Sequence, residues 1–256
     1  MCGRYTLIRL ADFTDMFPWI RPPEAPATPS RYNIAPTQPV AVVPNDGRNR
    51  VDFFHWGLVP SWAKDPSIGN RMINARVEGL SEKPAFRAAL RRRRCLIPAS
   101  GFYEWKKSPD GKSKTPMYIR MRDHKPFAFA GLWEVWHAPD GLSLRSCVIL
   151  TCPPNKLLES IHDRMPVILD PDDYQRWLEP AELESDKLAP ILRSYPAERM
   201  EAFAVGRGVN SPKNESASNI EPAGAAENEP ASLAAEPKTA RRGKNKDKPS
   251  EPRLFD

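Results

Sequence analysis

Three Asp-Gly turns, each between two runs rich in β-forming residues, limit most strongly what this chain can fold into. The turns are Asn45-Asp46-Gly47, Pro109-Asp110-Gly111 and Pro139-Asp140-Gly141. The flanking runs are QPVAVV and VDFFHWG, then GFYEWKK and TPMYIRM, then FAFAGLWEVW and LRSCVILT. Such a pair between β-rich runs is typical of a hairpin, because glycine accepts the positive φ that tight hairpin turns require. The sequence therefore predicts a mainly antiparallel sheet or a distorted barrel.

Two further strands and a few short helices complete the predicted core. The strands are MPVIL, from residue 165, and MEAFAV, from residue 200. Apolar residues at helical spacing predict a helix from about Leu10 to Phe17. Four more short helices are expected within KPAFRAALRRRR, PNKLLESIHDR, PDDYQRWLE and AELESDKLAPILR, the last interrupted at Pro190. Since no strand–helix–strand rhythm is present, the predicted fold class is α+β, with a barrel-like, mainly antiparallel β core and flanking helices.

The composition changes near Ala223. Residues 1–222 are expected to form one domain and residues 223–256 a disordered tail, because the tail is rich in Ala, Pro, Lys and Glu and has one aromatic residue, Phe255. The proline content, 29 residues against 13 glycines, fits a turn-rich domain followed by disordered sequence. The basic stretch RRGKNKDK in the tail either attracts nucleic acid non-specifically or only keeps the chain in solution.

The net charge and the cysteines limit which binding partners and which cellular compartment we expect. The net charge of +6 is compatible with a polyanionic partner. The sequence shows no signal peptide and no apolar run of membrane-spanning length, so we expect a cytoplasmic protein with reduced thiols. The four histidines lie in unrelated segments, and no CxxC pair occurs among the cysteines, which are Cys2, Cys95, Cys147 and Cys152. We therefore expect neither a metal site nor a cofactor.

Cys2 directly follows the initiator methionine. Removal of Met1 would leave a free α-amine on the residue that carries a thiol, and α-amines, with a pKa of about 7.7–8.0, are partly unprotonated near neutral pH. Such a 1,2-aminothiol condenses with an aldehyde to a Schiff base, which the thiolate closes to a five-membered thiazolidine. Together with the basic charge, this suggests the ring-opened sugar of an abasic site in DNA as the aldehyde. The alternative is that Cys2 is a chance residue in a frayed terminus.

Three further polar residues stand where acid–base chemistry needs them. Asn74 lies in the polar stretch RMINARVEG, Glu104 lies between two aromatic residues of a predicted strand, and His162 lies at a predicted helix end. Carboxylates and imidazoles at strand ends are suited to general acid–base catalysis. Each residue also has a structural explanation: a turn-forming Asn74, a Glu104 on the exposed strand face, and a His162 that caps its helix.

Eight short motifs follow one another along the chain. They are MCGRY, RYNIAPTQ, WGLVPSWAKD, NARVEG, RRRCLIPASGFYEW, FAGLWEVW, IHDRMPVIL and VNSPKN. In this order they resemble the motifs of the SRAP (SOS response-associated peptidase) family of abasic site processing proteins, from residue 2 to about residue 222. The resemblance implies a single α+β domain of a DNA-damage protein. Such a protein binds single-stranded DNA and crosslinks covalently to abasic sites, with lyase and autopeptidase side activities.

The resemblance also implies roles for individual residues. Cys2 would be the nucleophile of the thiazolidine crosslink, and Asn74 would hold its amine. Glu104 would transfer protons during imine formation and ring closure, and His162 would assist opening of the sugar ring. The chain matches the family motifs at all four positions.

A single-stranded substrate needs cations for its phosphates and aromatic surfaces for its bases. Pro36 and Trp62 together could wedge between bases and exclude a complementary strand, whereas Trp56 and Trp133 are expected in the core. The arginine run at 91–94 is either a phosphate contact or a solvated helix end. The candidate DNA-binding residues are Arg4, Arg71, Arg76, Arg87, Arg164, Pro36, Trp62 and Trp105.

Two other functions stay open at this point. One is a cysteine autopeptidase, in which the Cys2 thiol attacks the peptide bond after Met1. The other is a module that binds modified or single-stranded DNA without a covalent bond. Nothing in the sequence indicates an oligomer, so we expect a cytoplasmic monomer that acts on abasic single-stranded DNA, at the nucleoid if the protein is bacterial. The tail is available for a replication-associated partner.

Overall fold

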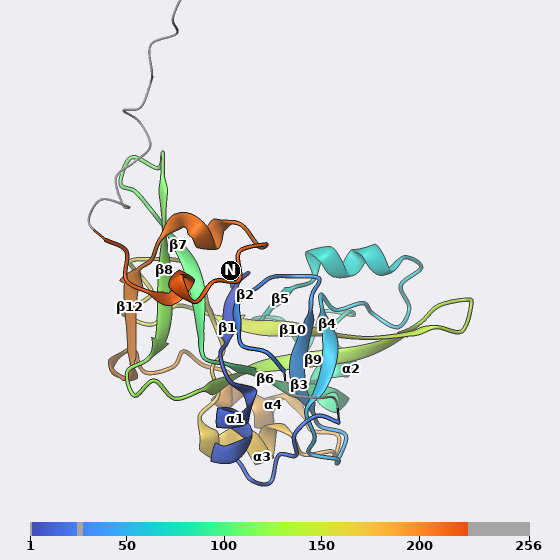
Figure 1. Cartoon of the computed structure of the whole chain (residues 1–256). Coiled ribbons are helices and arrows are strands. Elements are labelled where there is room, and N and C mark those ends of the chain that lie inside the picture. Colours follow the sequence, from blue (N-terminus) through green and yellow to red (C-terminus); the bar gives the residue numbers. More distant parts are fainter. Residues whose placement is uncertain (1, 25–27, 225–256) are drawn as a thin grey trace, which may run out of the picture.

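The structure is a computed structural model that describes residues 2–24 and 28–224 (Figure 1). The predicted tail at 223–256 therefore lies, except for its first two residues, outside the described residues. Two β-sheets organise the described part of the chain. One has five strands in the order β12-β8-β7-β1-β2, and the other has seven strands and closes on itself.

Five strands form a closed barrel. They are β3 (Pro39–Pro44), β4 (Asp52–Trp56), β6 (Arg94–Ala99), β9 (Phe127–His137) and β10 (Ser143–Cys152). β9 pairs antiparallel with both β6 and β10, and β3 pairs antiparallel with both β4 and β6. β4 closes the ring by pairing parallel with β10. The short strands β5 (Asn74–Arg76) and β11 (Met165–Pro166) pair with the second half of β10.

The other sheet lies beside the barrel and carries the first strand of the chain (Figure 1). Its strands are β1 (Tyr5–Leu7), β2 (Arg31–Ile34), β7 (Gly101–Lys107), β8 (Lys114–Met121) and β12 (Met200–Ala204). All of its pairings are antiparallel. Because β1 lies between β2 and β7, the residues at its N-terminal end are held from both sides.

The three Asp-Gly hairpins are confirmed. They join β3 to β4, β7 to β8 and β9 to β10, and each pair is antiparallel. The turn glycines Gly47, Gly111 and Gly141 have φ values of 78°, 70° and 87°, a region that glycine enters without a Cβ clash. The α+β class with a barrel-like, mainly antiparallel core is confirmed as well, although β10 also pairs parallel with β4 and β5.

The helices are short. The α-helices are α1 (Leu10–Met16), α2 (Arg87–Arg92), α3 (Tyr174–Trp177) and α4 (Ser185–Leu188). The 3-10 helices are η1 (Pro66–Arg71), η2 (Pro171–Asp173), η3 (Ala189–Ile191), η4 (Ala197–Arg199), η5 (Arg207–Asn210) and η6 (Ala217–Ile220). These elements confirm four of the five predicted helices. Figure 1 shows α1, α3 and α4 grouped below the barrel, whereas the C-terminal segment, in orange, lies near the start of β1.

The predicted helix at 154–164 is wrong. This segment forms successive turns instead. Asn155 Oδ1 caps the first turn by accepting from Leu158 N at 3.0 Å, and its Nδ2 donates to Tyr195 O at 2.7 Å. Backbone bonds of the helical i→i−4 type start only from Glu159 N and His162 N in this segment, so the turns do not join into a continuous helix. His162 therefore stands in a turn region before β11 and caps no helix there.

Apolar side chains from both sheets fill two cores. The larger one includes the barrel and contains Trp56, as predicted, with Trp133 packed partly buried against it. The smaller one joins Tyr103, Tyr118 and Val209 between the five-stranded sheet and the C-terminal segment. All four cysteines are free and buried. Within the described residues no helix has the length and apolar character that crossing a membrane requires.

Candidate active site

Cys2 lies just before β1 and is fully buried. Asn74, the first residue of β5, donates a hydrogen bond from Nδ2 to the Cys2 carbonyl oxygen at 2.7 Å. The contact joins the N-terminal end of β1 to the barrel, since β10 holds β5. The Asn74 Oδ1 is also buried and accepts no hydrogen bond from a described residue, so a hydrogen-bond acceptor is available beside the Cys2 backbone.

Glu104 lies on β7, the strand next to β1, and only 3% of its surface is exposed. Burial raises the pKa of its carboxyl group, and the charge that His162 can carry opposes the rise only in part. The reason is that surroundings of low dielectric constant disfavour the carboxylate. Glu104 therefore keeps its proton to higher pH than an exposed glutamate, and it is the stronger base once that proton is lost.

The Cys2 thiol interacts with the same carboxyl group. Burial, and after it the negative charge of Glu104, raises the pKa of the thiol well above its usual value. The charge of one group thus changes the proton affinity of the other, so the two groups form one electrostatic site. At neutral pH the thiol keeps its proton until a base removes it.

His162 stands in the turns before β11, with 27% of its side chain exposed. Its Nδ1 accepts the backbone N–H of Arg164 at 3.1 Å and lies 2.8 Å from a carboxylate oxygen of Asp163. An amide N–H can only donate, so Nδ1 accepts this bond, while the Asp163 carboxylate is an acceptor at the same nitrogen. A ring nitrogen between a donor and an acceptor is suited to proton transfer.

The structure thus brings together the four residues that the sequence analysis expects to carry the chemistry. Asn74 bonds Cys2 directly, and Glu104 acts on Cys2 through its charge. His162 acts on Glu104 in the same way. Their chemical roles stay predictions. Within residues 2–24 and 28–224, no group of three or more His, Cys, Asp or Glu side chains is placed to hold a metal ion.

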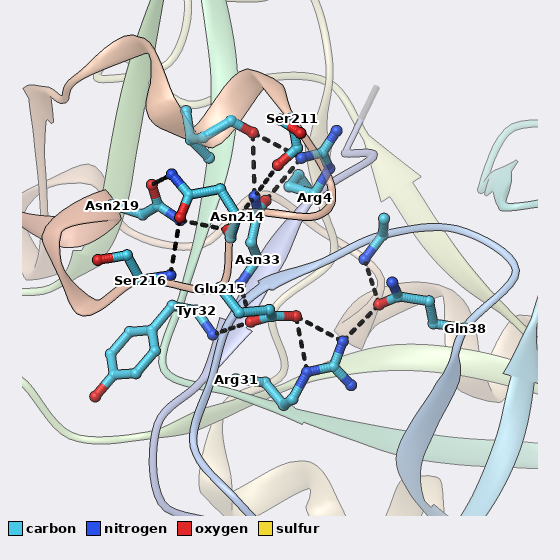
Figure 2. Close-up of polar contacts among 12 residues, drawn as sticks. Arg4, Arg31, Tyr32, Asn33, Gln38, Ser211, Asn214, Glu215, Ser216 and Asn219 are labelled. Carbon is cyan, nitrogen blue, oxygen red and sulfur yellow. Dashed lines mark hydrogen bonds and ion pairs between the residues drawn. The ribbon is translucent and has the colours of Figure 1, made fainter.

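Arg4, two residues after Cys2, is held by three contacts, and Figure 2 shows its hydrogen bonds. Its Nη1 donates to Asn33 Oδ1 and to Val209 O, both at 2.7 Å. Its guanidinium carbon lies 5.8 Å from the centre of the Trp105 ring, in a cation–π contact. Burial lowers the pKa of the guanidinium, which still stays charged at neutral pH. Arg4 therefore fixes a positive charge beside Cys2, as a phosphate contact requires.

Arg164 is committed to the protein itself. Its guanidinium forms a bidentate ion pair with Glu78 at 2.7 and 2.8 Å and donates to Thr151 O at 2.6 Å. The hydrogen bonds from Arg164 lower the pKa of Glu78. The residue is only 9% exposed, so a contact from Arg164 to DNA stays a prediction that these bonds do not favour.

The other candidate DNA contacts lie on several elements. Arg71 ends η1 and Arg76 ends β5, and both are exposed. Trp62, in the loop before η1, is 61% exposed, whereas Pro36, in the loop after β2, is half-buried. Arg87 is exposed on α2, which packs on β6 and β9 rather than on the strands around Cys2. Arg87 is therefore the candidate that lies apart from the others.

The arginine run at 91–94 takes part in the packing of the protein. Arg91 and Arg92 pair with Glu182 at 2.8 and 2.9 Å. Arg94 is fully buried, and its guanidinium donates to backbone carbonyl groups of the neighbouring segments. These contacts favour a structural role for the run over a phosphate contact.

Asn33 and the segment at 207–216 contact the site although the sequence analysis gives them no role. Asn33 and the 207–216 segment both bond Arg4. Their place within the motifs RYNIAPTQ and VNSPKN is the signal that could have found them. What the sequence lacks is any indication that these two motifs meet in space.

Comparison with known proteins shows relatives along most of the chain. The family model described as SOS response associated peptidase (SRAP) matches residues 1–212. Abasic site processing protein YoqW of Bacillus subtilis (strain 168) is 49% identical over 226 residues, which cover 86% of this chain and 99% of that protein. Abasic site processing protein YedK of Escherichia coli (strain K12) is 30% identical over 203 residues, which cover 78% and 88%.

A solved structure shares the fold. A crystal structure of a protein from Bacteroides thetaiotaomicron matches with a TM-score of 0.78 at 25% sequence identity, covering 87% of this chain and 100% of that one. Fold, motifs and family model agree over the same residues. The chain belongs to the SRAP family, the SOS response associated peptidases.

Proposed function

We propose that this protein processes abasic sites in single-stranded DNA by capturing them covalently through Cys2. Relatives that match most of the chain bear the name abasic site processing protein, which directs the proposal to that lesion. The observation that carries the chemistry is the hydrogen bond from Asn74 Nδ2 to the Cys2 carbonyl oxygen, beside the buried carboxyl group of Glu104. A residue that merely frayed at a terminus would not be held in this way.

His162 is assigned to the first step, the opening of the sugar. An abasic sugar closes to a cyclic hemiacetal, and its opening to the aldehyde requires a proton on the ring oxygen. An imidazole is suited to this because its charge changes near neutral pH. The partly exposed His162 ring, with a donor and an acceptor close to Nδ1, supports this assignment.

The amine of Cys2 attacks in the second step. With Met1 removed, the amine adds to the aldehyde carbon, and the carbinolamine that results loses its hydroxyl group as water once a proton is supplied. Glu104 supplies that proton, because burial raises the pKa of its carboxyl group. The buried Oδ1 of Asn74 accepts a hydrogen bond from the amine and orients it.

Ring closure makes the link durable. The Cys2 sulfur adds to the iminium carbon while its proton passes to the Glu104 carboxylate, which regains the proton it gave to the hydroxyl group, so aldehyde and aminothiol yield a thiazolidine and one water. The pKa of the thiol is raised by burial and by Glu104, so the step needs a base. A carboxylate whose own pKa is raised is a better base than an exposed one. The attack is intramolecular, which gives it a high effective concentration.

The DNA strand would be held by exposed and half-buried side chains. We assign Arg4, Arg71 and Arg76 to phosphate contacts. Such contacts hold a strand of any sequence equally well. Trp62, exposed over 61% of its surface, and Pro36, in the loop after β2, are assigned to the bases. Such a binding mode depends on unpaired bases, so we propose single strands as the substrate.

The test is the mass of the processed protein after incubation with a single-stranded oligonucleotide that bears one abasic site. We expect an adduct equal to protein plus oligonucleotide minus one water, mapped to Cys2 and stable on a denaturing gel. Cys2→Ala should form only a Schiff base, which borohydride traps and which otherwise ends in strand cleavage. Cys147→Ala, which removes another buried thiol, is the matched control and should crosslink like wild type.

Two outcomes contradict the proposal. If the wild-type protein forms no adduct but binds intact strands in a salt-sensitive way, it is a non-covalent binding module. An adduct of Cys2→Ala as durable as that of wild type would exclude the ring mechanism. Retention of Met1 in cells that lack aminopeptidase activity would exclude autopeptidase activity.

A further inference from the structure

A segment near the C-terminal end of the described chain lies over the start of β1 (Figure 2). Residues 207–216, termed the strap, begin with η5 and follow β12. Val209 is fully buried, and its carbonyl oxygen accepts from Arg4 Nη1 at 2.7 Å, across 205 positions of the sequence. Because Arg4 follows Cys2 by two residues, the strap holds the chain immediately after the proposed nucleophile.

The next strap residue reaches the neighbour of the second reacting group. Asn210 Oδ1 accepts from Trp105 Nε1 at 2.8 Å, and Trp105 directly follows Glu104 on β7. The Trp105 ring also packs against the Arg4 guanidinium, at 5.8 Å. Both strap contacts therefore converge on one pair of side chains, each within two residues of a reacting residue.

Asn33 on β2 bonds the strap and the arginine at once (Figure 2). Its side chain is fully buried, and its Oδ1 accepts from Arg4 Nη1 at 2.7 Å. Its Nδ2 donates to three strap carbonyl groups at 3.2, 2.8 and 2.8 Å, those of Val209, Ser211 and Asn214. A buried amide that is bonded on both sides makes its surroundings rigid.

Glu215 fastens the strap to β2 at the surface. Its Oε2 accepts the backbone N–H groups of Tyr32 and Asn33 at 2.8 and 3.0 Å. Its Oε1 accepts from Arg31 Nε at 2.8 Å and from Arg31 Nη2 at 2.7 Å. Charge-assisted bonds of this kind are stronger than neutral ones. One carboxylate thus anchors the end of the strap on the strand next to β1.

We propose that the strap is a positioning device for the crosslinking site: through Arg4 and Trp105 it fixes the start of β1 and keeps Cys2 buried beside Glu104. Its residues contact the neighbours of the reacting groups, so they are positioning residues. The effect on crosslinking rests on the proposed function, whereas the protection of Cys2 is a property of the free protein.

Single substitutions at exposed positions release the strap. Glu215→Ala removes its anchor on β2, and Asn210→Ala removes the acceptor of the Trp105 indole. Asn210→Asp keeps an acceptor oxygen and is the conservative variant. Glu221→Ala and Ser211→Ala are the matched controls, because both side chains are exposed and belong to the same C-terminal segment.

Alkylation of each cysteine in the processed protein without DNA, mapped by mass spectrometry, is the first readout. We expect Glu215→Ala and Asn210→Ala to speed alkylation of Cys2 about three- to tenfold, because each loses hydrogen bonds that hold the strap in place. Cys95 and Cys147 should keep their rates, since both are fully buried in barrel strands. Asn210→Asp and the controls should behave like wild type.

Unchanged alkylation of Cys2 in the two release variants overturns the proposal. A joint rise at Cys2, Cys95 and Cys147 overturns it too, because it would report general unfolding rather than release of one segment. The internal comparison of three thiols thus decides the matter even for a variant of lowered stability.

The rate of crosslinking to abasic single-stranded DNA is the second readout. At saturating DNA we expect the release variants to react about three- to tenfold more slowly, with a smaller change in the half-saturating concentration. Normal rates in variants of a protein that does crosslink overturn the strap proposal alone. A wild-type protein that forms no adduct overturns the proposed function instead, and the thiol readout then decides on the strap.

Discussion

Asn74 and Cys2 are joined by one hydrogen bond, 2.7 Å from side-chain nitrogen to carbonyl oxygen, that bridges two separate sheets. Asn74 belongs to the barrel because β5 pairs with β10, and Cys2 directly precedes the β1 region of the other sheet. The bond therefore sets the position of the proposed nucleophile relative to the barrel.

Replacing Asn74 by Asp should slow crosslinking about tenfold, because the change turns the donor that faces the Cys2 carbonyl into a second acceptor. The single-turnover rate on abasic single-stranded DNA measures this. Asn70→Asp makes the same chemical change at an exposed position and should have little effect. Equal rates for the Asn74 and Asn70 variants would mean that the hydrogen bond does not position Cys2.

Relative to wild type, Glu104→Gln should gain free energy of unfolding as the pH rises. In the unfolded chain the carboxyl group ionises near its usual pKa of about 4.3, whereas burial raises its pKa in the fold. Between the two pKa values the folded state binds more protons, so the stability of the wild type falls with rising pH. Glutamine keeps the size of the side chain and removes that titration, at the expense of crosslinking activity.

Urea unfolding at pH 4 and pH 8 checks the prediction for Glu104. Glu201→Gln is a control of opposite sign, because the hydrogen bond from Arg120 lowers the pKa of Glu201. The Glu201 variant should lose stability relative to wild type as the pH rises, by a small amount because the pair is partly exposed. If the difference in free energy of unfolding between Glu104→Gln and wild type is independent of pH, Glu104 has the same pKa in the folded and the unfolded state, which would contradict the prediction.

Local features of the fold could be predicted because the residues that determine them are neighbours in the chain. Each Asp-Gly turn lies between the two strands that it joins. The parallel pairing of β10 with β4 and β5 has no such local signal, and it is this pairing that closes the barrel and places Asn74 beside Cys2. The bond from Asn155 to Tyr195, which holds the turns at 154–164, joins residues distant in sequence, so the local pattern there gives no sign of it.

The site was predictable in its residue types but less so in its contacts. The sequence leaves open whether Glu104 faces solvent, and only the packing of β7 against β1 and the segments around them settles that it is buried. Arg164 has the charge of a DNA contact, yet Glu78 lies where it can bond both guanidinium nitrogens. Pairings of this kind depend on three-dimensional proximity, which a motif does not encode.

Gly69→Ala should lower the free energy of unfolding by about 1–3 kcal/mol, and the melting temperature by roughly 2–10 °C. A Cβ on Gly69 would lie 2.6 Å from the carbonyl oxygen of Gly57, whose own φ of 143° favours glycine. The two glycines bracket the loop that carries Trp62, so weaker binding of single-stranded DNA should accompany the loss. Gly224→Ala, which meets open space, is the control in a thermal melt. Equal melting temperatures would contradict the close approach of the two backbones.

Trp62→Ala should weaken binding of single-stranded DNA by about 1–3 kcal/mol, the contribution of stacking on one base. The melting temperature should not change, because the side chain is 61% exposed. Fluorescence anisotropy with a labelled oligonucleotide measures the affinity. Leu142→Ala removes another exposed apolar side chain, at 70% exposure on the β9–β10 hairpin, and should bind like wild type. Similar losses in both variants would point to a non-specific surface effect.

Alanine substitutions at Arg76 and Arg164 should distinguish an arginine that contacts phosphate from one that packs within the protein. Arg76→Ala removes an exposed cation at the end of β5, so the slope of log affinity against log salt should fall by about 0.7. Its melting temperature should stay that of wild type. Arg164→Ala breaks a bidentate pair with Glu78 and removes one of the two donors to the Thr151 carbonyl, so it should lose about 1–3 kcal/mol of stability. Salt titrations of binding and urea unfolding of both variants decide between the roles. A reduced salt slope with full stability in Arg164→Ala would assign that guanidinium to DNA after all.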